Sequence, residues 1–129
     1  RLDGMSEFDL FWHVVRPTPA AATDPLFFDY PAQPVFHWHN ETFELPADAT
    51  LLLESDACPR QGFRYGDRVW ALQFHPEVDP AIIQEWTAID ASCGNKRELH
   101  HVPDPFYRAA ELRALATRLI ERWMEKIPA

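Results

Sequence analysis

The spacing of apolar residues changes near residue 79. Before it, short apolar runs rich in aromatic and β-branched residues are separated by turn-forming residues, which is typical of β-strands. After it, apolar residues recur every three or four positions, which is typical of helices that pack on a core. The pattern predicts strands at 8–15, 34–39, 50–55, 61–65 and 68–74, and helices at 80–93 and 105–126, an order that would be α+β in an isolated domain.

Turn and capping residues delimit several of these elements. A Gly-Asp pair at 66–67 predicts the turn of a hairpin. Asp79 precedes Pro80, and this pair suits the N-cap and the first position of a helix. Asp104 and Pro105 repeat the same signal. We therefore expect both helices to begin directly after an aspartate.

Each predicted helix has one apolar face. In the first helix this face holds Ile82, Ile83, Trp86 and Ile89. In the second helix the expected buried stripe is Leu112, Leu115, Leu119, Ile120 and Trp123. Two helices are too few to cover a sheet with this many apolar strands. We therefore expect another part of the protein, or a second chain, to pack against these strands.

Composition narrows the classes of function. A chain of 129 residues suits one domain. The formal net charge of −8 argues against nucleic acid and against anionic membrane surfaces, since both bind basic faces. No apolar run is long enough to span a membrane. The two cysteines, Cys58 and Cys93, do not have the spacing of a zinc or redox motif, so we expect a reducing, cytoplasmic location.

The segment His75-Pro76-Glu77 is the strongest candidate for chemistry. It follows the predicted strand 68–74, at the end where α/β sheets carry their sites. A carboxylate can orient an imidazole through one ring nitrogen and leave the other nitrogen to act as a general base. The same spacing also occurs in surface turns, so it does not decide between the two interpretations.

A nucleophile for such a pair is hard to find in these residues. Cys58 is followed by Pro59 and then a strand, whereas a nucleophilic cysteine is favoured at a strand-to-helix turn. Cys93 ends a predicted helix, where the helix dipole does not stabilise a thiolate. His37 and His39 alternate on one side of a strand and could join His75 in a metal site, but solvent-facing residues at a strand end are the alternative.

One stretch carries a family resemblance. Residues 36–78, FHWHNETFELPADATLLLESDACPRQGFRYGDRVWALQFHPEV, resemble the C-terminal half of a class I glutamine amidotransferase domain, and most of all the group similar to the amidotransferase part of GMP synthase. The resemblance covers about residues 7–92. It implies an α/β fold class, in which residues 1–129 are the C-terminal portion of one domain, a flavodoxin-like three-layer sandwich.

The resemblance also implies the reaction and its residues. Glutamine would be hydrolysed to glutamate and ammonia by a Cys-His-Glu triad, without a cofactor or a metal. His75 and Glu77 would be the second and third members of this triad. The loop that contains His39, Asn40 and Glu41 would lie beside the glutamine pocket, where backbone groups hold the amino-acid end of the substrate.

The sequence departs from the family at the nucleophile. The family's G-x-C-x-G turn is absent, so we expect the cysteine to lie on a missing N-terminal half or on a second chain, and these residues alone to be inactive. The alternatives are a non-catalytic assembly module, a related thiol hydrolase that cleaves γ-glutamyl bonds, and a metal-binding module. A synthetase partner that accepts the ammonia and self-association of the chain both stay open.

Overall fold

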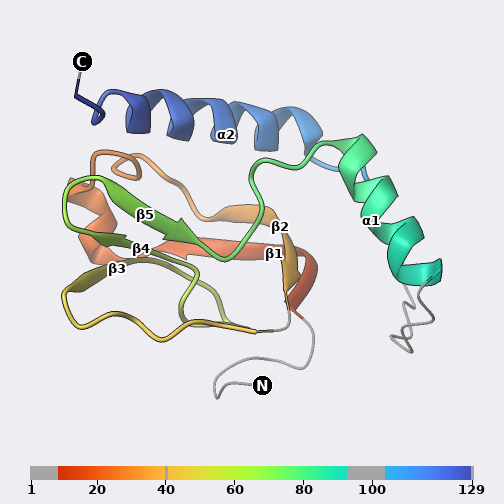
Figure 1. Ribbon diagram of the computed structural model, residues 1–129, viewed down its shortest axis with the longest axis horizontal. Helices are drawn as coiled ribbons and strands as arrows, with labels where there is room; N and C mark the ends of the chain where they lie inside the picture. Colours follow the sequence, from red (N-terminus) through yellow and green to blue (C-terminus); the bar gives the residue numbers. More distant parts are fainter. Residues whose placement is uncertain (1–8, 40, 93–103, 129) are drawn as a thin grey trace.

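The computed structural model describes residues 9–39, 41–92 and 104–128. The predicted strands and helices are confirmed in type and order, and a short 3-10 helix, η1, was not predicted (Figure 1). The elements are β1 (Asp9–Pro17), η1 (Pro19–Thr23), β2 (Gln33–His39), β3 (Ala49–Glu54), β4 (Gly62–Tyr65), β5 (Val69–Leu72), α1 (Pro80–Ser92) and α2 (Ala109–Met124).

The strands form one sheet in the order β2-β1-β3-β4-β5. Each neighbouring pair is antiparallel. The long strand β1 pairs with β2 over most of its length and reaches β3 only at its last residues, Arg16 and Pro17. The predicted mixed α/β class is confirmed, and the described part of the chain supplies antiparallel strands rather than the parallel strands of a doubly wound sheet.

The hairpin and the first helix cap form as predicted. Gly66 has a φ of +64°, a left-handed conformation that glycine adopts without steric cost, and it begins the turn between β4 and β5. Asp79 caps α1, because its Oδ1 accepts a hydrogen bond from the Ile82 N–H at 2.8 Å.

The second helix begins later than predicted. Asp104 Oδ1 accepts a hydrogen bond from the Phe106 N–H at 2.9 Å, as a helix cap would. Arg108, however, has a φ of +52° and interrupts the helical geometry, so the predicted start at Pro105 is wrong and α2 begins at Ala109.

The predicted apolar faces are partly right. Leu112, Leu115 and Leu119 of α2 are buried, and so is Ile83 of α1. The prediction is wrong for three residues that are exposed rather than buried, which are Ile89, Ile120 and Trp123. The last two line a hollow between α2 and β5 that the described residues leave unfilled.

The connection after β5 carries the chain from one edge of the sheet to the other. The Gln73 N–H donates to the Gln61 carbonyl at 2.9 Å. Two residues later, the His75 N–H donates to the Phe36 carbonyl of β2 at 2.8 Å. Because β5 and β2 are the two ends of the strand order, these bonds curl the sheet and fix the backbone of His75 against β2.

A buried carboxylate ties the segment after η1 to the hairpin. The Asp24 side chain is fully buried, and its Oδ1 accepts hydrogen bonds from the N–H groups of Leu26 and Phe27 at 2.9 and 3.2 Å. Arg64 of β4 donates from Nε at 3.0 Å, and Trp70 of β5 donates from Nε1 at 3.2 Å. A buried charge is tolerated only when it is paired in this way.

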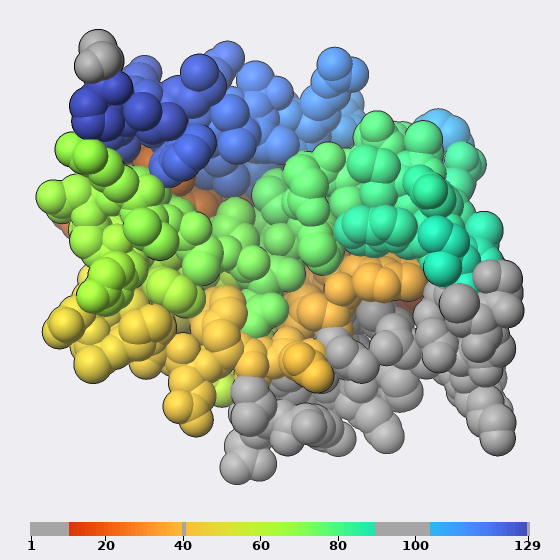
Figure 2. Space-filling model, in the orientation of Figure 1, coloured from red at the N-terminus to blue at the C-terminus, as the bar shows by residue number. Residues whose placement is uncertain are grey.

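Arg122 holds α2 on the same segment. Its guanidinium donates to both carboxylate oxygens of Asp29, at 2.7 and 2.9 Å, and to the Leu26 carbonyl at 2.9 Å. It also lies 4.3 Å from the centre of the Phe28 ring. The hydrogen bond from Arg122 lowers the pKa of Asp29 below its ordinary value. In the space-filling view α2 lies along one side of the molecule, against the segment that follows β5 (Figure 2).

We expect Asp24→Ala to lower the free energy of unfolding by about 3 kcal/mol, because it leaves several donors without their buried acceptor. Denaturant unfolding followed by circular dichroism measures the change. Asp67→Ala, which removes an exposed carboxylate from the hairpin turn, is the control and should change stability by less than about 0.5 kcal/mol. Equal effects of the two substitutions would contradict the structural role of Asp24.

Candidate active site

His75 and Glu77 are brought together as the sequence predicts. The Nδ1 atom of His75 lies 2.7 Å from Oε1 of Glu77. The side chain of His75 is 29% exposed and that of Glu77 is 62% exposed. Among the described residues, no hydrogen bond is made to the Nε2 atom of His75. The imidazole is therefore oriented by a carboxylate and offers its second nitrogen to a partner.

The protonation of the pair follows from this hydrogen bond. A carboxylate only accepts, so Nδ1 carries the proton, and in the neutral ring Nε2 is then the acceptor. Partial burial raises the pKa of Glu77, but the hydrogen bond and positive charge from His75 outweigh it, and the pKa of this carboxyl lies below its ordinary value. Glu77 is thus ionised at neutral pH, as an orienting carboxylate must be.

The ring of His75 also packs against α1. The ring of Trp86 lies edge-to-face with it, at 5.0 Å between ring centres. The sequence placed Trp86 on the apolar face of a helix but did not connect it with His75. A contact between residues from a turn and a helix depends on how α1 docks, which a local pattern does not reveal.

The surroundings of His39, in the candidate substrate loop, differ from those of His75. Both ring nitrogens of His39 are engaged, because Nδ1 donates to the Glu41 carbonyl at 2.9 Å and Nε2 lies 3.4 Å from Nδ1 of His37. The side chain of His39 therefore shapes the loop. Glu41 is exposed, and Asn40 lies outside the described residues.

The structure adds Thr42 to this loop, which the sequence did not single out. Thr42 is buried, and its Oγ1 accepts hydrogen bonds from the Cys58 thiol at 3.3 Å and from Nε2 of Gln73 at 3.4 Å. Gln73 precedes His75 by two residues. The candidate substrate loop is thus tied to the segment that carries the histidine.

Cys58 has the environment of a structural residue. It is 0% exposed, and it lies in a turn where Ser55 Oγ accepts from the Cys58 N–H and donates to its carbonyl. The sequence did not favour Cys58 as a nucleophile, and in the structure its side chain is completely buried. Cys93 lies outside the described residues.

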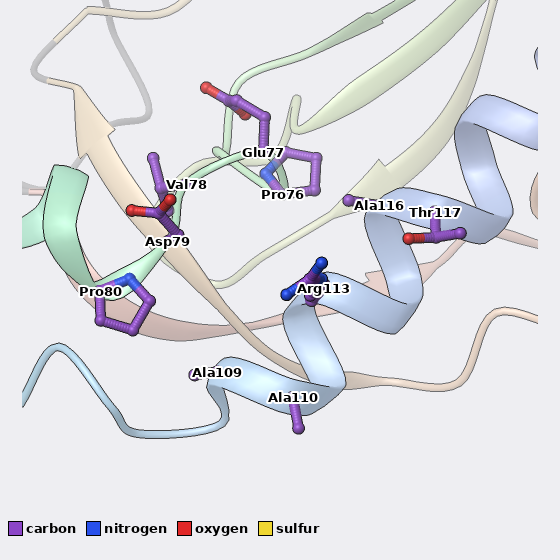
Figure 3. Close-up of a pocket in the computed structure, with 10 residues that line it drawn as sticks. All are labelled: Pro76, Glu77, Val78, Asp79, Pro80, Ala109, Ala110, Arg113, Ala116 and Thr117. Carbon is purple, nitrogen blue, oxygen red and sulfur yellow. The ribbon is translucent and has the colours of Figure 1, made fainter.

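A large hollow lies beside Glu77 rather than beside the imidazole. Its volume is about 580 Å³, and the 76–80 turn and the first half of α2 line it (Figure 3). Arg113 is among its lining residues, whereas the Glu77 side chain extends away from α2 in this view. His75 is not among them, so the hollow does not mark the reacting centre.

Neither a metal site nor a membrane-spanning helix is found among the described residues. Within the described ranges, no group of three or more histidine, cysteine, aspartate or glutamate side chains could hold a metal ion. Among the helices that the structure describes, none is long and apolar enough to cross a membrane.

Comparison with known proteins supports the family resemblance. No family model matches the chain. Over 43 residues it is 49% identical to a glutamine amidotransferase-like protein, YfeJ, of Salmonella typhimurium, an alignment that covers 33% of this chain and 18% of that protein. Over 46 residues it is 41% identical to gamma-glutamyl peptidase 3 of Arabidopsis thaliana, which covers 36% of this chain and 18% of the peptidase.

The fold extends the likeness to nearly the whole chain. A glutamine amidotransferase from Methylobacillus flagellatus superposes with a TM-score of 0.81 at 22% identity, over 97% of this chain and 55% of that one. A glutamine amidotransferase from Thermotoga maritima gives a TM-score of 0.80 at 26% identity, over 97% and 54%. The structural neighbours are thus glutamine amidotransferases, as the sequence led us to expect, and the chain spans about half of their length.

The lowered pKa of Glu77 predicts a pH-dependent contribution to stability. An unfolded carboxyl binds its proton more readily than Glu77 does in the folded protein. The contribution should therefore be present above about pH 4.5, the ordinary pKa, and be lost as the pH falls through the lower folded value.

Unfolding of the unmodified protein and of Glu77→Gln between pH 6 and pH 3 measures this contribution. The difference in midpoint between them should shrink toward zero as the pH falls. Glu121→Gln on the exposed side of α2 controls for the loss of one negative charge. A difference that stays constant over this range would show that Glu77 is not ionised preferentially in the folded state.

Proposed function

We propose that this chain supplies the His75 and Glu77 of a Cys-His-Glu triad that hydrolyses the side-chain amide of glutamine, and that the cysteine lies outside the chain. The observation that carries the proposal is the 2.7 Å hydrogen bond between His75 Nδ1 and Glu77 Oε1, with Nε2 left for a nucleophile. The likeness to glutamine amidotransferases over 97% of the chain supports it.

In the proposed reaction a cysteine thiolate attacks the amide carbon of glutamine. His75 removes the thiol proton through Nε2 and returns it to the leaving nitrogen, so that ammonia departs and a thioester remains. Water then attacks the thioester while His75 takes its proton, and glutamate leaves. Glu77 stabilises the imidazolium that forms in both steps.

The loop after β2 is the proposed position of the amino-acid end of glutamine. His39 Nδ1 donates a hydrogen bond to the Glu41 carbonyl, and Thr42 Oγ1 accepts hydrogen bonds from Cys58 and Gln73. We propose that backbone groups of this loop, which contains His39, Asn40 and Glu41, bind the amino-acid end of the substrate.

The location of the nucleophile rests on two observations. The thiol of Cys58 is fully buried and donates to Thr42, so a substrate cannot reach it. The chain also spans only 55% and 54% of its structural neighbours. We propose that residues 1–129 are the C-terminal portion of one amidotransferase-like domain, and that an N-terminal half or a second chain completes it.

The fate of the ammonia belongs to the same proposal. An amidotransferase passes ammonia to a synthetase domain or to a partner protein, and we propose such a partner here. Self-association of the chain is a separate proposal, because a second copy could cover apolar strands that two helices do not cover. We propose a cytoplasmic location, where a reducing environment keeps a free thiol from forming disulfides.

The 129 residues alone should not hydrolyse glutamine. Loss of the nucleophile of a hydrolytic triad costs on the order of 10⁶ in turnover, which is about 8 kcal/mol of barrier. Release of glutamate from glutamine by the purified 129-residue chain measures this. Turnover by that chain, sensitive to Cys58→Ala, would place the nucleophile inside it and overturn the proposal.

In the intact protein that provides the cysteine, His75→Ala should lower kcat by on the order of 10⁶-fold, about as much as replacement of the cysteine itself. Glu77→Gln should lower kcat by less, because the imidazole keeps a neutral partner. Glu121→Gln is the matched control and should leave the rate unchanged. Activity that survives His75→Ala would show that this histidine is not the base.

Hydrolysis of a γ-glutamyl peptide is the second candidate, and the 41% identity to gamma-glutamyl peptidase 3 favours it. The same triad would serve, because only the leaving amine differs. Parallel assays of free glutamine and a γ-glutamyl dipeptide separate the two functions. Release of ammonia from glutamine at the higher kcat/KM supports the amidotransferase, and the opposite preference supports the peptidase.

A further inference from the structure

The hydrogen bond to Glu77 is not sufficient to fix the imidazole of His75. Glu77 is 62% exposed, and a hydrogen-bonded ion pair at such a surface is weak because water competes for both partners. An imidazole that rotates about its χ angles would move Nε2 away from a nucleophile. The ring therefore needs a second contact that water does not replace.

Trp86 makes such a contact. Its ring lies 5.0 Å from the imidazole at an interplanar angle of 76°, the edge-to-face geometry that aromatic pairs favour. Glu77 holds the imidazole at Nδ1, and Trp86 packs against the ring. The two contacts restrain different motions of the same side chain.

The position of Trp86 is itself tied to the strand that holds the backbone of His75. Its ring lies 6.0 Å from that of Trp38, and Trp38 stacks on Phe36 at 6.3 Å and 18°. Phe36 is the residue whose carbonyl accepts the His75 N–H. The N–H of His75 thus bonds the main chain of Phe36, and the imidazole packs on Trp86, which belongs to the aromatic cluster of Phe36, Trp38 and Trp86.

We infer that Trp86 is a positioning residue that holds the imidazole of His75 in the orientation that directs Nε2 to the nucleophile. The importance of this orientation for catalysis rests on the proposed function. Trp86 would not touch the substrate. Its effect would pass through the ring of His75, and α1 would belong to the catalytic structure through this one side chain.

The direct test is the Nδ1–H signal of His75, observed by NMR with ¹⁵N-labelled histidine in the intact protein. In the unmodified protein we expect Nδ1 protonation and slow exchange of this proton with water. Trp86→Ala should raise the exchange rate by about tenfold or more, because local opening is easier. Trp86→Phe keeps an aromatic edge and should restore most of the protection.

A matched core variant separates positioning from general loss of stability. Ile83 lies on the same helix and is 1% exposed, so Ile83→Ala should destabilise the fold to an extent comparable with Trp86→Ala. We expect it to leave the Nδ1–H exchange of His75 close to that of the unmodified protein. Unchanged exchange in Trp86→Ala, or the same acceleration in Ile83→Ala, would overturn the inference.

Kinetics of the intact protein add a second readout. A small displacement of a catalytic group costs on the order of 10²-fold in rate, so Trp86→Ala should lower kcat by about that factor and leave KM nearly unchanged. A rise in KM with kcat preserved would contradict a positioning role. The NMR measurement needs no activity, so absence of glutamine hydrolysis in the unmodified protein would refute the proposed function separately.

Discussion

The hydrogen bond from the His75 N–H to the Phe36 carbonyl fixes the position of the candidate site relative to the sheet. It closes a path from β5, at one edge of the sheet, to β2, at the other. This bond attaches the turn that contains Glu77 directly to β2. With it, the turn lies against the strand that leads into the loop of His39, Asn40 and Glu41, so the candidate base and the candidate substrate loop share one support.

The rest of the chain stabilises the two sides of this connection by different means. On the hairpin side, the buried carboxylate of Asp24 holds β4 and β5 through Arg64 and Trp70. On the β2 side, aromatic packing predominates, with Trp86 of α1 between the imidazole and the cluster of Trp38 and Phe36. Polar contacts thus hold the hairpin, while the imidazole contacts both a carboxylate, Glu77, and an aromatic ring, Trp86. The exposed pair of His75 and Glu77 can remain a hydrogen-bonded pair because the backbone beneath it is fixed.

Much of this structure could be predicted from the sequence, because local pattern determines local structure. Alternating and helical periodicities located the strands and helices, and Asp79 and Gly66 marked a cap and a turn that the structure confirms. Arg108 escaped prediction, since a left-handed arginine leaves no local signal and delays α2. Asp24 escaped as well, because its role depends on donors some 40 residues away in Arg64 and Trp70. For the candidate site, a short motif proposed His75 and Glu77, whereas Trp86 and Thr42 could not be singled out because their contacts form only when the chain folds.

The central claim is that His75 and Glu77 serve a cysteine that this chain does not contain. The most direct test is to treat the intact protein with a glutamine analogue whose side chain carries an electrophile, and to locate the labelled residue by peptide mass spectrometry. The account predicts a label on a cysteine outside residues 1–129, and loss of labelling in His75→Ala. A label on Cys58 or Cys93, or labelling that does not depend on His75, would contradict it.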